Sequence, residues 1–121
     1  MTQKKILICD DEPQLRELIA ARLCACGYAV VEASDGIECM RAIENNRPDV
    51  ILLDLNMPRA SGIDVLNKLA ERSMQIPVIV LSGAINFGEA GSVKNLRPDQ
   101  FMAKPFAIRE LVNKIDKICH P

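Results

Sequence analysis

Short apolar runs alternate with segments whose apolar residues recur at helical spacing along most of the chain. Five runs have the length and largely apolar composition of strands in a buried parallel sheet. We expect these strands at residues 6–9, 28–33, 50–53, 77–81 and 101–103. Strands that alternate with helices in this way are typical of an α/β fold, with a parallel sheet between two layers of helices.

Four of the remaining segments have the spacing of amphipathic helices. Their expected buried residues are Leu15, Leu18, Ile19 and Leu23; Ile37, Met40 and Ile43; Ile63, Leu66 and Leu69; and Ile108, Leu111, Val112, Ile115, Ile118 and Cys119. Local signals also mark helix ends. Pro13 suits a first helical turn, Gly27 stops the first helix, and the turn at Ser34-Asp35-Gly36 caps the second.

Length and composition indicate one domain over residues 1–121. Of the 121 residues, 49% are hydrophobic and 26% are charged, which is ordinary for a globular protein. Fifteen basic against sixteen acidic residues leave a net charge of −1, which argues against nucleic-acid binding through bulk charge. No apolar run approaches the roughly 18 residues of a membrane span or forms a signal-peptide core. We therefore expect a cytoplasmic protein with no membrane or nucleic-acid partner.

The five cysteines do not form a recognisable metal or redox motif. Their number is odd, and Cys24-Ala25-Cys26 lacks the two-residue spacer of a redox or zinc pair. The only histidine, His120, is next to the last residue. We expect reduced structural thiols, as in other cytoplasmic proteins, and no zinc site.

Polar residues directly follow four of the five expected strands. They are the pair Asp10-Asp11, then Asp54, Ser82 and Lys104. Each residue alone would be explained as the cap of a loop or helix. Parallel strands of a doubly wound sheet, however, end along one edge, which is where such folds bind ligands. An acidic pair, a third acid, a hydroxyl group and a lysine at one edge indicate a functional site.

The charges of this group favour chemistry with a metal ion and phosphate. Two like charges about 4 Å apart repel by about 4 kcal/mol at an effective dielectric near 20, so clustered carboxylates hold protons or a cation. Oxygen-only ligands in small number suit Mg²⁺. Asp54 is the candidate nucleophile toward phosphorus and would form an acyl phosphate, while Ser82 and Lys104 would bind the phosphoryl group.

With these motifs, essentially the whole chain resembles the receiver domain of two-component response regulators, such as the chemotaxis regulator. The motifs that carry the resemblance are Asp10-Asp11, Leu53-Asp54-Leu55-Asn56-Met57-Pro58, Leu81-Ser82-Gly83 and Lys104-Pro105-Phe106, in that order. The resemblance implies a flavodoxin-like (βα)5 fold, in which a five-stranded, doubly wound parallel sheet has the strand order 2-1-3-4-5.

The resemblance also implies a role for each matching position. Asp54 would accept a phosphoryl group from a histidine kinase or a phosphotransfer protein. Asp11 would bind Mg²⁺, or alternatively Mn²⁺, directly, and Asp10 would bind it mostly through water. Asp54 and the backbone carbonyl of Asn56 would complete the protein's ligands. Such a domain catalyses phosphoryl transfer only at its own aspartate and is not an enzyme toward other substrates.

The family pattern further implies a conformational switch. Ser82 would move to bind the phosphoryl group and Phe101 would rotate inward, although Phe101 also fits plain core packing. The Lys104–Pro105 peptide bond is expected to be cis. The output partner would bind the face formed by the fourth helix, the fifth strand and the fifth helix, on a monomer or weak dimer.

Two segments depart from the family pattern. Ala60-Ser61 replaces the usual Met-Asp, with little harm expected because Ser also caps helices. Arg97-Pro98 stands where Gly-Ala is usual, and with Gly88 and Gly91 it weakens the expected fourth helix over residues 84–98. We expect no DNA-binding or enzymatic output domain after the last helix.

Two other functions remain as alternatives. One is a receiver-like module that binds partners without phosphorylation, against which the cost of three clustered carboxylates argues. The other is an aspartyl-phosphate phosphatase of the haloacid-dehalogenase type. Those enzymes need a second Asp two residues after the nucleophile, where this chain has Asn56, and usually carry a cap domain. A nucleotide-binding role is disfavoured because Asp10-Asp11-Glu12-Pro13 follows the first strand in place of a glycine-rich loop.

Overall fold

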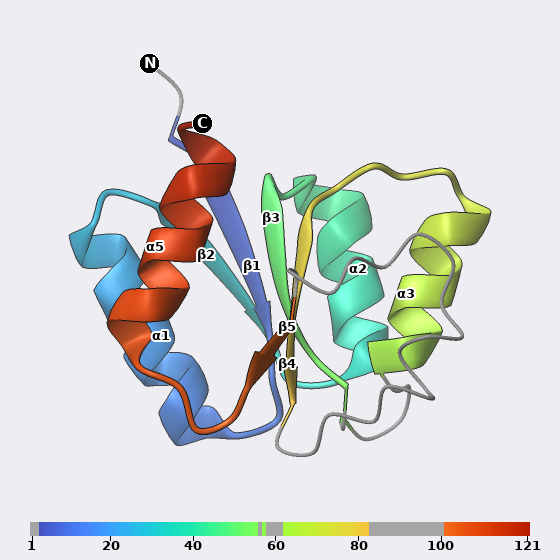
Figure 1. Cartoon of the computed structure of the whole chain (residues 1–121). Coiled ribbons are helices and arrows are strands. Elements are labelled where there is room, and N and C mark those ends of the chain that lie inside the picture. The colour runs from blue at the N-terminus through green and yellow to red at the C-terminus, as the bar shows by residue number, and fades with distance from the viewer. Residues whose placement is uncertain (1–2, 56, 58–61, 83–100) are drawn as a thin grey trace.

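A single parallel sheet forms the centre of the protein (Figure 1). The structure is a computed structural model, and it describes residues 3–55, 57, 62–82 and 101–121. The sheet has the order β2-β1-β3-β4-β5, and every neighbouring pair is parallel. This confirms the expected doubly wound α/β fold. The strands are β1 (Lys5–Cys9), β2 (Ala29–Ala33), β3 (Val50–Asp54), β4 (Val78–Ser82) and β5 (Phe101–Ala103).

Helices cover both faces of this sheet. Figure 1 shows α1 and α5 on one face and α2 and α3 on the other. Their bounds are Pro13–Ala25 for α1, Gly36–Asn46 for α2, Gly62–Glu71 for α3 and Ile108–Cys119 for α5. The expected end signals are present. Asp35 caps α2 by accepting a hydrogen bond from the Glu38 backbone N–H at 2.8 Å, and Gly27 follows α1 with a φ of +95°.

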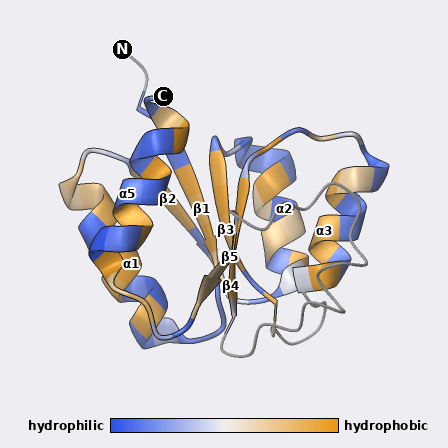
Figure 2. Ribbon diagram, in the orientation of Figure 1, coloured by the Kyte–Doolittle hydropathy of each residue, from blue (hydrophilic) through white to orange (hydrophobic). Residues whose placement is uncertain are grey.

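The core consists of two apolar layers, one on each face of the sheet. Alternate residues of a strand point to opposite faces, so Leu7 packs toward α2 and α3 while Ile6 and Ile8 pack toward α1 and α5. Every residue of β3 is buried, as expected for a central strand. Figure 2 shows the strands as largely hydrophobic, while the helices carry both hydrophobic and hydrophilic residues. These layers hold the carboxyl ends of the strands together at one edge.

Two expected core residues lie at the surface instead. The prediction for Leu18 and Ile37 is wrong, because their exposed fractions are 57% and 41%. Ile19 and Leu23 are one helical turn apart and completely buried, and they define the inner line of α1. Leu18 precedes Ile19 by one residue and is therefore rotated by about 100° away from that line. Helical spacing alone does not show which of two neighbouring apolar residues, Leu18 or Ile19, points toward the core.

The expectation of five reduced thiols is also wrong. Cys9 at the end of β1 and Cys39 in α2 form a disulfide, with their Cα atoms 5.9 Å apart, and both residues are fully buried. Cys24, Cys26 and Cys119 are free thiols. The sequence gives no local signal for the pair, because 30 residues separate the two cysteines and only the packing of α2 against β1 brings them together.

Some sequence predictions lie outside the described residues. They concern Asn56, Ala60-Ser61, Arg97-Pro98 and the helix expected over residues 84–98. In the part of the chain that the structure describes, no helix has the length and apolar character needed to cross a membrane.

Candidate functional site

Asp54 ends the central strand of the sheet, at the edge where the sequence predicts a site. It pairs in register with Leu81 of β4, and the backbone N–H of Leu55 donates to the Leu81 carbonyl at 3.4 Å. Its side chain is only 5% exposed. The apolar residues of β3 bury this strand at the centre of the sheet. Its last residue, Asp54, is therefore a buried carboxylate at the switch point of the sheet.

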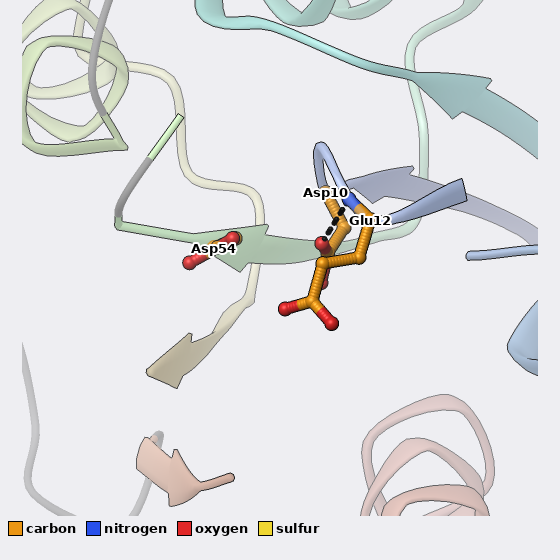
Figure 3. Close-up of side chains that lie close together, drawn as sticks. All are labelled: Asp10, Glu12 and Asp54. Carbon is orange, nitrogen blue, oxygen red and sulfur yellow. Dashed lines mark hydrogen bonds between the residues drawn. The ribbon is translucent and has the colours of Figure 1, made fainter. Parts of the chain in front are cut away.

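Asp10 and Glu12 extend from the loop after β1 toward the end of β3 (Figure 3). Asp10 is fully buried, and its backbone N–H donates to the Ala33 carbonyl at 3.1 Å. Its Oδ1 atom accepts a hydrogen bond from the Glu12 backbone N–H at 2.9 Å, which tightens the turn into α1. One carboxylate oxygen from each of Asp10, Glu12 and Asp54 lies within 4.8 Å of the others.

Lys104 follows β5 directly and supplies positive charge to this acidic group. Its Nζ atom donates to Asp10 Oδ2 at 2.9 Å and to Glu12 Oε1 at 2.8 Å, and lies 3.5 Å from Asp54 Oδ2. Partial burial by itself lowers the pKa of the Lys104 ammonium. The hydrogen bonds to Glu12 and Asp10 outweigh this effect and raise that pKa above its usual range. Lys104 is therefore a fixed cation beside the carboxylates.

Arg16 of α1 secures the backbone of the acidic loop. Its Nη1 atom donates to the Asp10 carbonyl at 2.7 Å, and its Nε atom donates to Glu32 Oε1 of β2 at 3.1 Å. The guanidinium thus joins the loop to the neighbouring strand and helix, since its rigid fork can satisfy two acceptors at once. This contact limits movement of the backbone that carries Asp10.

Gly62 lets α3 begin directly against the end of β3. Its N–H donates to the Leu55 carbonyl at 3.1 Å. A Cβ atom at this position would lie 2.5 Å from the Asp54 carbonyl oxygen and 2.7 Å from the Leu55 Cα. No larger side chain fits there without moving backbone, so this glycine determines how closely α3 approaches the Asp54 segment.

The donor set fits a divalent cation of the magnesium type. Carboxylate oxygens are the ligands that Mg²⁺ prefers, and it needs few of them because it keeps several waters. Three carboxylates against one lysine also leave the pocket with excess negative charge. A cation that bound here would reduce the repulsion between these groups.

The structure brings together only part of the predicted site. Asp10, Asp54 and Lys104 meet as expected, whereas the Asp11 side chain is exposed and Asn56 lies outside the described residues. Ser82 ends β4 opposite Ala103. Phe101 begins β5, half-buried against the apolar layer beneath α2 and α3. The Lys104–Pro105 peptide bond is cis, in agreement with the family pattern.

Three contributors to the site were not assigned from the sequence: Glu12, Arg16 and Gly62. Glu12 directly follows the acidic pair and precedes the first residue of α1, so its place in the sequence was a signal. Arg16 gave none, because its partners are a backbone carbonyl and a residue of another strand. The sequence shows a glycine near the start of a helix at position 62, but not that this glycine lies against the backbone of Asp54.

Comparisons with known proteins agree with this geometry. The model of the response regulator receiver domain family matches residues 6–116. Response regulator MprA from Mycobacterium sp. (strain KMS) is 35% identical over 111 residues, which are 92% of this chain and 48% of MprA. The chain thus spans about half the length of this relative.

Two solved structures show the same fold. Chemotaxis response regulator CheY4 of Vibrio cholerae has a TM-score of 0.84 at 26% identity, covering 97% of this chain and 99% of that one. Response regulator TrrA of Thermotoga maritima, solved in complex with Mg²⁺ and BeF, has a TM-score of 0.80 at 28% identity, covering 96% of this chain and 99% of TrrA. With the family match over nearly the whole chain, this protein belongs to the response regulator receiver domain family.

Proposed function

We propose that this receiver domain, covering residues 1–121, accepts a phosphoryl group on Asp54 from a histidine kinase or a phosphotransfer protein. The observation that carries the assignment to Asp54 is its position. It is a buried carboxylate at the end of the central strand, with two more carboxylates and the Lys104 ammonium beside it. Asp10, the other buried acid of the group, lies in the loop after β1, where its Oδ1 atom holds the Glu12 backbone N–H at the turn into α1.

The transfer forms one bond and breaks another. A carboxylate oxygen of Asp54 attacks phosphorus, the P–N bond of a phosphohistidine donor breaks, and the leaving imidazole takes up a proton. Lys104 is close enough to pair with the phosphoryl oxygens after a small movement from its present position, 3.5 Å from Asp54 Oδ2. The same site would later lose the phosphoryl group to water, so the domain acts only on its own aspartate.

The proposed metal is Mg²⁺, with Mn²⁺ as the alternative. Asp10, Asp11, Asp54 and the backbone carbonyl of Asn56 are the proposed ligands from the family pattern, and the clustered oxygens of Asp10 and Asp54 support two of them. The related TrrA was solved in complex with Mg²⁺ and BeF, and this supports the proposal that the present chain also binds Mg²⁺. When bound, the metal supplies positive charge that offsets the carboxylates and the incoming phosphoryl oxygens.

The phosphoryl group is proposed to act through Ser82 and Phe101. Their strand positions support this, because β4 and β5 are neighbours and Ser82 lies at the end of β4 nearest Lys104. Phe101 opens β5 and is half-buried, so it can change its packing without crossing the whole core. The output partner would then bind β5, α5 and the segment before β5.

Partner and location remain proposals of the same kind. The family implies a histidine kinase as the source of phosphoryl groups. A cytoplasmic monomer or weak dimer fits that role, with no direct contact to nucleic acid or membrane by these residues. Because the chain spans about half of MprA, an output activity would belong to other parts of such longer proteins.

The decisive experiment is intact-mass measurement after incubation with acetyl phosphate, with and without Mg²⁺. We expect one base-labile phosphoryl group on the wild type, formed only with Mg²⁺, and none on the Asp54→Asn variant. Asp64→Asn, the same change at an exposed position of α3, is the matched control and should still be modified.

The other outcomes identify the alternatives. No adduct with any phosphodonor would contradict phosphoacceptor function and favour a module that binds partners without phosphorylation. Continuous hydrolysis of an added phosphomonoester by wild type would instead indicate a phosphatase. An adduct that persists in Asp54→Asn would show that another residue is the acceptor.

A further inference from the structure

Lys104 lies closer to the acidic loop than to the proposed phosphoacceptor. Its Nζ atom is 2.8 Å from Glu12 Oε1 and 2.9 Å from Asp10 Oδ2, against 3.5 Å from Asp54 Oδ2. The only lysine among the site residues is therefore already bound by two carboxylates that are not the acceptor. Any phosphoryl group on Asp54 must compete with them for this cation.

We infer that Glu12 is a positioning residue that holds Lys104 in the resting state and releases it to the phosphoryl group. The inference rests on the proposed function of Asp54 and adds to it a residue that acts through Lys104. Glu12 itself does not contact the acceptor's reacting atoms in this role. It sets how readily the lysine can move toward them.

Glu12 is the carboxylate that can release Lys104, because it is far more exposed to water than Asp10. Its side chain is 59% exposed, whereas the Asp10 side chain is fully buried and the Lys104 side chain is 13% exposed. A released Glu12 carboxylate is hydrated at once, so breaking this pair costs little. Asp10 has no such access to water, and its loop is fixed by the Glu12 N–H and by Arg16.

Charge supplies the driving force for the exchange. An aspartyl phosphate carries a charge of about −1.5 to −2 at neutral pH, more than the carboxylate that it replaces. Lys104 gains a stronger partner on the side of Asp54 and loses a weak, solvated one on the side of Glu12. The resting contact therefore opposes phosphoryl binding by a modest and adjustable amount.

The test measures equilibrium binding of beryllium fluoride, an anion that mimics a phosphoryl group, by titration calorimetry at saturating Mg²⁺. Because exposed ion pairs contribute about 0.2–1 kcal/mol, we expect Glu12→Gln to bind it about 1.4- to fivefold more tightly than wild type. Glu17→Gln removes the same charge from an exposed position of α1 and should match wild type.

Two further arms separate holding of the lysine from simple loss of charge. Glu12→Asp keeps the charge but withdraws the carboxylate by one methylene, so it should also tighten beryllium fluoride binding. In NMR spectra of the metal-free protein, the ammonium protons of Lys104 should exchange with water faster in Glu12→Gln than in wild type. Neither change is expected from a purely structural role of Glu12.

Several results would overturn the inference. Equal or weaker beryllium fluoride binding by Glu12→Gln would do so, as would a Glu12→Asp variant that behaves like wild type. A tenfold loss of Mg²⁺ affinity in Glu12→Gln would make Glu12 a metal ligand instead. If wild type binds neither Mg²⁺ nor beryllium fluoride, the proposed function itself fails, which is a distinct result.

Discussion

The two ends of the sheet both join residues that are distant in sequence, but with opposite balances of charge. At the carboxyl end of the strands, Lys104 reaches Asp10 across 94 positions. At the other end, the Tyr28 hydroxyl donates to Asp116 of α5 across 88 positions. One lysine faces three carboxylates in the first case, whereas one neutral donor meets one carboxylate in the second.

This difference in charge balance distinguishes the acidic pocket, which is a functional site, from the Tyr28–Asp116 hydrogen bond, which only stabilises the fold. In the Tyr28–Asp116 pair a single carboxylate accepts a hydrogen bond from a neutral hydroxyl, so no second acid repels it there. The acidic pocket has more negative charge than Lys104 can offset, which costs folding free energy unless a cation or protons are bound. An excess of like charge in a buried position is thus a better sign of function than the long-range contact itself.

The largest expected effect comes from comparing one glycine at each end. Gly62→Ala should lower the free energy of unfolding by about 2–3 kcal/mol, because the new Cβ would overlap the Asp54 carbonyl oxygen. Gly27→Ala, beside Tyr28, has open space but a φ of +95°, so it should cost only about 1 kcal/mol. Urea unfolding of both variants measures the two costs. If both variants lost the same free energy of unfolding, α3 would have moved away from Asp54 to make room for the new Cβ atom without a large penalty.

The second comparison expects opposite signs at the two ends. In buffer without divalent cations, Asp54→Asn should raise the free energy of unfolding by about 1 kcal/mol, because it removes one of the repelling carboxylates. Tyr28→Phe should lower that free energy by about 1 kcal/mol, because it removes the hydrogen bond to Asp116. Thermal and urea unfolding provide the measurement. A loss of stability in Asp54→Asn would show that the attraction between Lys104 and Asp54 already outweighs the repulsion between the carboxylates.

The smallest effect is the part of the pH dependence that comes from Tyr28. Burial, and then the hydrogen bond to Asp116, raise the pKa of the Tyr28 hydroxyl above its ordinary value of 10.0. Above about pH 10 the unfolded chain loses this proton while the folded protein keeps it, so stability falls as pH rises. Tyr28→Phe should show a shallower fall in urea unfolding experiments. A residual slope remains because the pKa values of Lys104 and Cys119 are raised too.

Features that local sequence encodes were predicted well. The strands follow from their short, largely apolar runs, and the ends of α1 and α2 follow from Pro13, Gly27 and Asp35. The meeting of Asp10, Asp54 and Lys104 follows from topology, because parallel strands bring their carboxyl ends to one edge.

Features that depend on the geometry of packing were not predictable in this way. The rotation of α1 leaves Leu18 exposed, and the packing of α2 on β1 joins Cys9 to Cys39. Glu12 enters the pocket only because the turn after Asp10 directs it toward Lys104. These outcomes depend on distances of a few ångströms, which a pattern of residue types does not contain.

The spread of the pocket along the chain also ties its chemistry to biosynthesis. Asp10 and Glu12 are made before Asp54, and Lys104 is made after it, and the strands that carry them pair through long crossovers. A nascent chain that has not yet exposed β5 outside the ribosome has acids without their lysine. Competence to accept a phosphoryl group would therefore appear only when β5 pairs with β4, and it would report on the folding of this sheet.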